Sequence, residues 1–359
     1  MVTSLRRALE IQGGSVNEFD LGKSHLLYTL LFKALEPQLQ GVQHLVVAAS
    51  GPLGSLPFGL FVTQPPASQN GYTHTKWLIK EMAISHAPSV QAFYSLRGAP
   101  AKAPAPKTLL AFADPVLDGV SRDSKQTQAQ CVATGPMNTD TLRALAPLPE
   151  TTDEVRAVAR VMGVNKSSLF FRERANENTL RNQTLTDYRV LYFATHGLLP
   201  GELRCQAEPG VVLSPPMQQA TQTESDGLLA ASEIAQMKLN AELVVLSACN
   251  TAGGGGKFGG EALSGLAESF FYAGARGLVV SHWQVPSRAT AMLLSNMFEF
   301  LGPDLKGGAA LALREAQLKM ISRQSESHPF FWAAFVLVGD GVAGGQAPVV
   351  KQAQLGVFR

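Results

Sequence analysis

Short apolar runs alternate with amphipathic stretches along most of the chain. The apolar runs lie at 44–49, 107–113, 190–195, 243–248, 277–283 and 332–338, with a shorter one at 168–172. Helical spacing of apolar residues falls between them, at 24–38, 89–96, 151–162, 176–182, 261–273, 288–301 and 308–323. Uniformly apolar strands are typical of parallel sheets that are covered on both faces. The alternation therefore predicts an α/β protein with a doubly wound, mostly parallel sheet.

A proline-rich segment divides the chain. Residues 99–107 read Ala-Pro-Ala-Lys-Ala-Pro-Ala-Pro-Lys, which predicts a semi-rigid extended linker. We predict four parts, which are an N-terminal unit at 1–98, the linker at 99–107, the main α/β domain at 108–345 and a tail at 346–359. Polar insertions at 115–148 and 198–226 interrupt the main domain. The second joins two of the predicted strands, so we expect it to lie over the sheet edge, where loops shape access.

A histidine and a cysteine each follow one of the apolar runs. His196 comes directly after Val190–Thr195, and Cys249 directly after Leu243–Ala248. Neighbouring strands lie about 4.8 Å apart, and reactive groups of such sheets gather at the strand C-terminal ends. The two residues are 53 positions apart (249 − 196), and a base histidine about 50 residues before a nucleophilic cysteine is the caspase arrangement. We predict a catalytic dyad; the alternative is a structural histidine beside a buried thiol.

Composition and charge argue against several kinds of partner and site. The formal charge is +2, from 30 basic and 28 acidic residues, and no basic run appears, so we expect no nucleic-acid or membrane partner. No apolar run approaches the roughly 18 residues that span a bilayer. Three cysteines do not make a disulfide framework, which predicts a cytoplasmic protein in which Cys131 and Cys205 are incidental. The spacing of His196, Cys205 and Cys249 fits no metal site.

A glycine run follows the cysteine. Residues 253–260 read Gly-Gly-Gly-Gly-Lys-Phe-Gly-Gly, and a G-x-G-x-x-G match lies within them. A dinucleotide site would need an acid after the next strand, and a P-loop would need Ser or Thr after Lys257. Neither is present, so we expect no cofactor. A nucleotide-binding regulatory domain remains a minor alternative to a flexible backbone beside the nucleophile.

Several segments together resemble the CHAT family, whose members are caspase-like domains often joined to or partnered with tetratricopeptide repeats. The resemblance extends from about residue 25 to 340. It is carried by His196-Gly197, the run from Leu243 to Ala252, Gly260-Glu261-Ala262, Gly265-Leu266 and the run from His328 to Phe335, with Leu56-Pro57-Phe58, Ala87-Pro88-Ser89 and the run from Leu148 to Thr151 upstream.

The resemblance implies a cysteine endopeptidase related to caspases and separases, with His196 and Cys249 as its catalytic residues and a protein as its substrate. It implies a caspase-like three-layer αβα sandwich and a first half that is a pseudo-domain without catalytic groups. It also implies gating by a partner or an activating event. No 34-residue period is visible, so a tetratricopeptide-repeat or other regulatory partner would be a separate chain. The main alternative is a catalytically silent interaction scaffold.

The remaining site residues are predicted from chemistry and from the caspase pattern. The backbone N–H groups of Gly197 and Cys249 are the candidates for an oxyanion hole. Trp283 and Gln284 stand where caspases carry a Trp-Arg pair, and Gln284 cannot hold a carboxylate as an arginine does. Asp226 is a candidate for binding a basic substrate side chain, with a turn cap as the alternative. No acid is evident to orient His196, which leaves a backbone carbonyl for that role.

Overall fold

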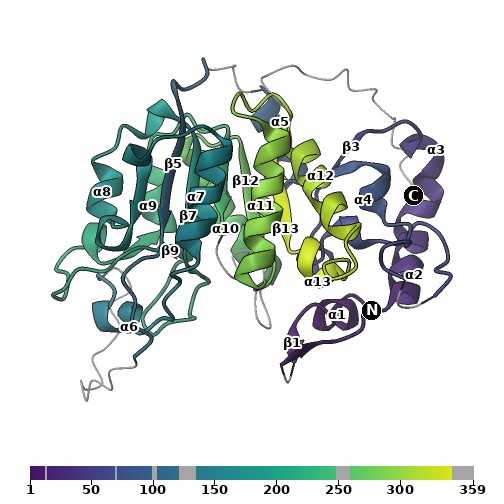
Figure 1. The fold of residues 1–359 in the computed structure, drawn as a ribbon, viewed down its shortest axis with the longest axis horizontal. Helices are drawn as coiled ribbons and strands as arrows, with labels where there is room; N and C mark the ends of the chain where they lie inside the picture. Colours follow the sequence, from purple (N-terminus) through teal and green to yellow (C-terminus); the bar gives the residue numbers. More distant parts are fainter. Residues whose placement is uncertain (13, 69–70, 99–102, 121–134, 248–258, 342–359) are drawn as a thin grey trace.

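One eight-stranded sheet forms the centre of the molecule (Figure 1). The computed structural model describes all residues except 13, 69–70, 99–102, 121–134, 248–258 and 342–359. The strands run in the order β3 (His44–Val47), β4 (Ala83–His86), β13 (Phe335–Gly339), β12 (Gly277–Ser281), β11 (Leu243–Leu246), β7 (Tyr188–Ala194), β5 (Lys107–Ala113) and β6 (Leu169–Phe171). Every neighbouring pair is parallel except β12 and β13.

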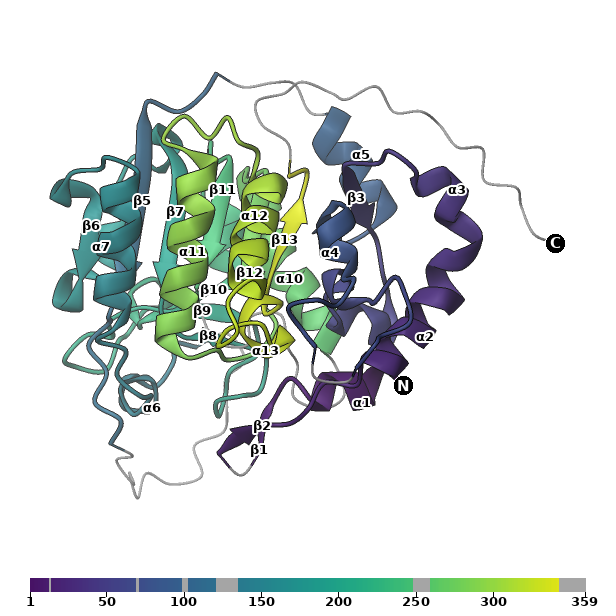
Figure 2. The ribbon, with the colours of Figure 1, turned by 45° about the vertical axis from the view of Figure 1, so that its right-hand side comes forward.

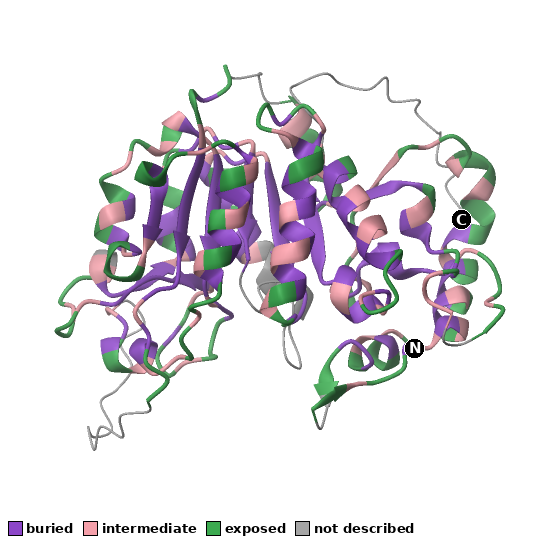
Figure 3. Ribbon diagram, viewed as in Figure 1, coloured by how far each residue is buried: buried purple, intermediate pink, exposed green. Residues whose placement is uncertain are grey.

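Helices cover both faces of this sheet. On one face lie α7 (Thr151–Val161), α11 (Ser287–Leu301) and α12 (Ala309–Ile321), and on the other lie α8 (Glu177–Arg181), α9 (Ala231–Gln236) and α10 (Gly259–Ala273) (Figures 1 and 2). Side chains of β7 alternate between the layers: Tyr192 packs with the α7 side and Phe193 with the α10 side. Both faces of the strands are therefore buried (Figure 3), which confirms the predicted three-layer α/β architecture.

The first hundred residues contribute to the same sheet. β3 and β4 pair in parallel with each other, and β4 pairs with β13, so the sheet continues into this part of the chain. Around these strands lie α2 (Leu21–Phe32), α3 (Glu36–Leu39), α4 (Leu78–Glu81) and α5 (Val90–Gly98). They are preceded by α1 (Val2–Arg7) and the hairpin of β1 (Ile11–Gln12) and β2 (Ser15–Val16). The boundary at 99–107 and the division into domains stay predictions.

A small sheet lies in the region predicted as a polar insertion. β8 (Gly197–Leu198), β9 (Gly210–Val212) and β10 (Leu228–Ala230) form three antiparallel strands, and α6 (Thr139–Arg143) packs beside them. Leu142 and Val212 are fully buried in this third cluster. The sheet begins directly after β7, so it stands at the C-terminal end of the main sheet, as expected for the loop between the two central strands.

The start of the last strand differs from the prediction. Residues 332–338 were expected to be a strand, but α13 (Pro329–Trp332) occupies the start, and β13 begins at Phe335. Proline at the first helical position favours this short helix. Within the described part of the chain, no helix combines the length and apolar character needed to cross a bilayer.

Candidate active site

The two strands that precede His196 and Cys249 are direct neighbours. β7 and β11 pair in parallel with Phe193 opposite Leu246, and Ser247 N–H donates to the Phe193 carbonyl over 2.9 Å. The adjacency of strands that the predicted dyad requires is therefore present. His196 follows Phe193 by three positions, and Cys249 follows Leu246 by three positions. Cys249 itself lies outside the described residues.

The ring of His196 is held by a backbone carbonyl. Its Nε2 lies 2.7 Å from the carbonyl oxygen of Ala146, in the segment between α6 and α7. A carbonyl oxygen only accepts hydrogen bonds, so Nε2 must carry the proton of this bond. In the neutral ring the lone pair is then on Nδ1, the nitrogen that remains to act as a base. From the sequence we expected a backbone carbonyl, and not an acid, to orient His196, and the Ala146 carbonyl makes such a contact.

Gly197 presents its amide at an open sheet edge. The Val212 N–H donates to the His196 carbonyl over 2.8 Å, so His196 and Val212 form a hydrogen-bonded pair. The next pair, Gly197 and Val211, is then of the non-hydrogen-bonded kind. The Gly197 N–H consequently points away from β9, and β8 has no further neighbour in the described three-stranded sheet. Gly197 is itself buried, and the direction of its N–H is the one that the predicted oxyanion hole requires.

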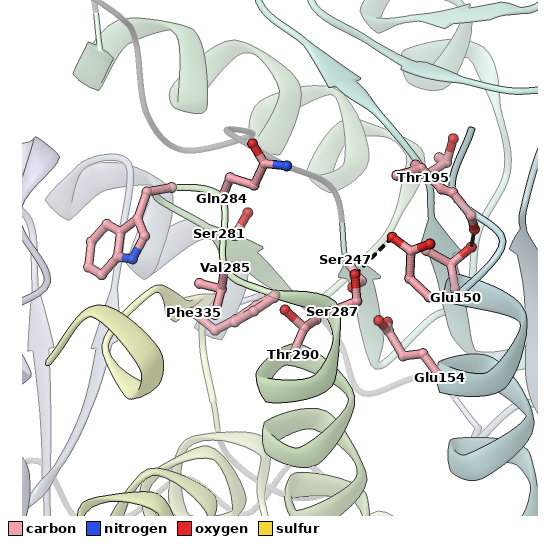
Figure 4. Close-up of a pocket in the computed structure, with 13 residues that line it drawn as sticks. Glu150, Glu154, Thr195, Ser247, Ser281, Gln284, Val285, Ser287, Thr290 and Phe335 are labelled. Atoms are coloured by element: carbon pink, nitrogen blue, oxygen red, sulfur yellow. Dashed lines mark hydrogen bonds between the residues drawn. The ribbon is translucent and has the colours of Figure 1, made fainter. Parts of the chain in front are cut away.

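A pocket opens at the ends of the central strands (Figure 4). It contains about 480 Å³ of empty space, counting its open mouth. Strand ends supply Thr195, Ser247 and Ser281, and most of the rest come from the beginnings of two helices and the connections that lead into them. The full lining is Leu148, Glu150, Thr151, Glu154, Thr195, Ser247, Ser281, Trp283, Gln284, Val285, Ser287, Thr290 and Phe335. Thr195 precedes His196 in the chain, so the pocket lies next to the strand end that leads to His196.

A buried polar network forms part of the pocket wall. The Tyr192 hydroxyl donates to Glu154 Oε1 over 2.7 Å, and the Ser247 hydroxyl bonds both of these groups. Glu154 is 3% exposed. Burial raises the pKa of its carboxyl to about 7, with the negative charge of Glu150 adding to the rise and the two hydroxyls opposing it. Near neutral pH this carboxyl therefore exists in both protonation states.

A second carboxyl stands nearer to solvent. Glu150 is exposed, and its Oε1 accepts a hydrogen bond of 2.8 Å from the Ser287 hydroxyl. Figure 4 shows Glu150 and Glu154 on the same side of the pocket, with Ser287 and Thr290 beside them. None of the described residues that line the pocket is lysine, arginine or histidine. The pocket is thus polar and acidic, with apolar walls from Val285 and Phe335.

The predicted substrate-pocket residues fall in two places. Trp283 and Gln284 line the pocket; Trp283 is buried and donates from Nε1 to the Phe330 carbonyl, and Gln284 is exposed. Asp226 does not line it. Its carboxylate is 3% exposed and accepts from the Met137 and Leu228 N–H groups, each over 2.7 Å. These contacts are those of the turn cap that the sequence also allowed.

Cys205 differs from the expectation of an incidental thiol, because it takes part in a disulfide bond. It lies in the second predicted insertion, outside the pocket lining. The described residues contain no cluster of three or more His, Cys, Asp or Glu side chains that could hold a metal ion.

Glu150, Glu154 and the hydroxyls around them were not predicted. A signal for Glu154 was present, since it shares the buried stripe of α7 with Val155 and Val158. A carboxyl on the buried face of a helix must find hydrogen-bond partners inside the protein. Tyr192, with its hydroxyl in an otherwise apolar strand, was the second signal.

The sheet topology, the carbonyl-held histidine and the adjacent cysteine-bearing strand define a caspase-like class of α/β fold. The chain belongs to the CHAT family: the CHAT domain model matches residues 22–340.

Two curated relatives share part of the chain. Tetratricopeptide repeat protein 28 from Mus musculus is 32% identical over 148 residues, and the Homo sapiens protein is 33% identical over 148 residues. Each match covers 40% of this chain and only 6% of the relative's length.

Two solved structures resemble the fold at low identity. The Saccharomyces cerevisiae separase–securin complex aligns with 87% of this chain and 17% of its own, at 15% identity and a TM-score of 0.47. The Arg-specific cysteine proteinase gingipain R aligns with 86% of this chain and 66% of its own, at 9% identity and a TM-score of 0.47.

Proposed function

We propose that this CHAT domain is a cysteine endopeptidase that cleaves a protein substrate with a His196–Cys249 dyad. The in-register pairing of β7 with β11 carries the proposal, because it sends both chain segments out of the same sheet edge. Cys249 follows Ser247 by two residues, a distance that an extended chain spans in about 7 Å. The tetratricopeptide-repeat relatives support a repeat protein or another regulatory protein as the partner that gates cleavage.

In this mechanism the Cys249 thiol loses its proton to His196 Nδ1, and the thiolate attacks the peptide carbonyl carbon. The carbonyl oxygen becomes an oxyanion that the Gly197 and Cys249 N–H groups stabilise. The C–N bond then breaks, and the imidazolium returns the proton to the leaving amine. Water hydrolyses the thioester and releases the thiol. The Ala146 carbonyl keeps the imidazole oriented throughout.

The acidic pocket beside the dyad suits a cationic side chain. A lysine or arginine before the cleaved bond would place its methylene groups along Val285 and Phe335 and its charge near Glu150 and Glu154. Hydroxyl groups of the lining supply further hydrogen-bond acceptors. We propose that the enzyme prefers a basic residue at this position, because the exposed Glu150 gives the mouth a negative charge and the exposed Gln284 adds no positive one.

The proposal is tested by the reactivity of the three thiols. Once the disulfide of Cys205 has been reduced, a peptidyl acyloxymethyl ketone with lysine at its reactive end should alkylate Cys249 faster than Cys131 or Cys205, because the proposal places a base beside Cys249 alone. His196→Ala should slow that labelling by about tenfold or more, since the thiolate fraction falls. Peptide mass spectrometry of the labelled protein gives the rates. Slow labelling of Cys249 that His196→Ala leaves unchanged would favour the silent scaffold instead.

Charge reversal at the pocket mouth should alter substrate preference. In Glu150→Lys, kcat/KM for peptides with lysine or arginine before the cut should fall by about tenfold relative to peptides with leucine, because like charges repel in a partly desolvated site. Fluorogenic peptide pairs measure this ratio. Asp153→Lys is the matched control, since Asp153 is an exposed carboxylate of the same helix and does not line the pocket. An equal change in both variants would show a general charge effect and contradict the assignment.

A further inference from the structure

An arginine from the N-terminal helix contacts the wall of the pocket. Arg6 Nη2 donates to the His282 carbonyl over 2.5 Å, and the guanidinium carbon lies 4.9 Å from the centroid of the Trp283 ring. The contact joins α1 to the segment after β12, across 276 residues of sequence. Figure 2 shows α1 beyond the C-terminal ends of the strands, beside α13. The N-terminal helix therefore touches the site from outside the main α/β layers.

The contact involves a cation that is largely removed from water. The Arg6 side chain is 14% exposed, and burial lowers its pKa. Glu10, the acidic partner, is 3.7 Å away and 48% exposed, so it compensates only part of the desolvation. Arg6 Nη1 makes no hydrogen bond with the described residues. An apolar side chain would avoid this cost, so the specific contribution of arginine is its contact with His282 and Trp283.

The contacted segment forms one wall of the pocket. Ser281, Trp283, Gln284 and Val285 all line it, within the connection from β12 to α11. The main body of the protein holds this connection through the Trp283 Nε1 bond to the Phe330 carbonyl and through backbone pairing. Arg6, which belongs to α1, holds the same connection through its contacts with the His282 carbonyl and the Trp283 ring. The indole, clamped by Arg6 on its face and by the carbonyl at its edge, has little freedom to turn.

We propose that Arg6 is a positioning residue, which fixes the 281–285 wall and so couples the state of the N-terminal helix to substrate binding. The proposal rests on the proposed peptidase function, since it concerns the pocket of that reaction. When α1 is in place, the wall is ordered and the pocket accepts the substrate side chain. When α1 is displaced, the wall loses its outer anchor and binding weakens, without any change at the dyad.

The test combines substrate kinetics with a probe of the wall that needs no activity. Arg6→Met keeps the apolar stem and removes the charge, and Arg6→Lys restores a cation without the planar fork. Arg7→Met is the matched control, because Arg7 is exposed in the same helix. Protein labelled with 5-fluorotryptophan should give one ¹⁹F signal for each of Trp77, Trp283 and Trp332, and Trp283→Phe assigns the second.

Arg6→Met should shift or broaden the Trp283 signal, leave the other two in place, and raise KM for lysine peptides about five- to tenfold while kcat changes less than about twofold. Arg6→Lys should recover part of the KM change, and Arg7→Met should resemble the parent. Unchanged Trp283 signal and KM in a folded Arg6→Met protein would overturn the proposal. So would equal effects of Arg6→Met and Arg7→Met.

If Arg6→Met does not fold, as moved Trp77 and Trp332 signals would reveal, Arg6→Lys decides by the same two measurements. If the parent cleaves no peptide, the peptidase function fails. In that case KM is replaced by the dissociation constant of a lysine peptide, and a Trp283 shift without weaker binding overturns the coupling.

Discussion

Replacing Cys249 with alanine should abolish cleavage of a protein substrate, with kcat/KM falling on the order of a thousandfold or more. Without the thiol no thioester forms, and the neighbouring groups can only polarise the peptide bond. His196→Ala should cause a loss of similar size, because the same proton transfer is needed to form the thiolate and to release the amine. Since the two residues act as a unit, the double variant should be no slower than either single variant.

Gel-based cleavage of a susceptible protein, followed over time, measures these rates. His74→Ala is the control for the histidine, because His74 is exposed and does not line the pocket. The two histidine variants should keep the melting temperature of the parent, since His196 is only partly buried and His74 is exposed. Parent-like cleavage by Cys249→Ala would end the peptidase assignment. Separate multiplicative losses in the double variant would contradict a shared mechanism.

Strong local patterns accounted for the parts of the fold that the sequence predicted well. β5 occupies 107–113 as expected, because five of its seven residues are buried and the run is bounded by the proline-rich segment and by Asp114. The strands before His196 and Cys249 were recognised for the same reason. That they are neighbours in register is a tertiary fact, but successive strands of a parallel α/β pattern usually lie close together, and the segment between these two holds a small three-stranded sheet and α9.

Other parts depended on contacts that no local pattern contains. β4 was missed because Ala83–His86 is short and mixes Ser85 and His86 with apolar residues, although pairing on both sides buries it. β13 runs antiparallel to β12 because of the path that the chain takes through α12 and α13 before it re-enters the sheet. Of the pocket lining only Trp283 and Gln284 were predicted, since the other residues come from segments between 148 and 335 that only the fold brings together.

The buried carboxyl of Glu154 should make the protein less stable as the pH rises. Its pKa is raised from 4.5 to about 7, so the folded state retains a proton that the unfolded chain releases above pH 4.5. The free energy of unfolding therefore falls between about pH 4.5 and 7 and levels off above that. At about 1.4 kcal/mol per pKa unit, the full effect is about 3 kcal/mol. Burial also raises the pKa of Glu177, to about 8. Its carboxyl therefore lowers the free energy of unfolding in the same way, up to about pH 8.

Glu154→Gln should remove the Glu154 part of this dependence, because the amide resembles the protonated acid and never ionises. Relative to the parent, the variant should gain about 2–3 kcal/mol between pH 5 and pH 8, measured by urea unfolding at both values. His86 and His328, whose pKa values burial lowers to about 4, destabilise both proteins equally below pH 6.5 and cancel in the difference. Asp153→Asn, on the exposed side of the same helix, should follow the parent. Identical pH slopes in Glu154→Gln and the parent would mean that the Glu154 carboxyl is ionised over this whole pH range and that burial does not raise its pKa.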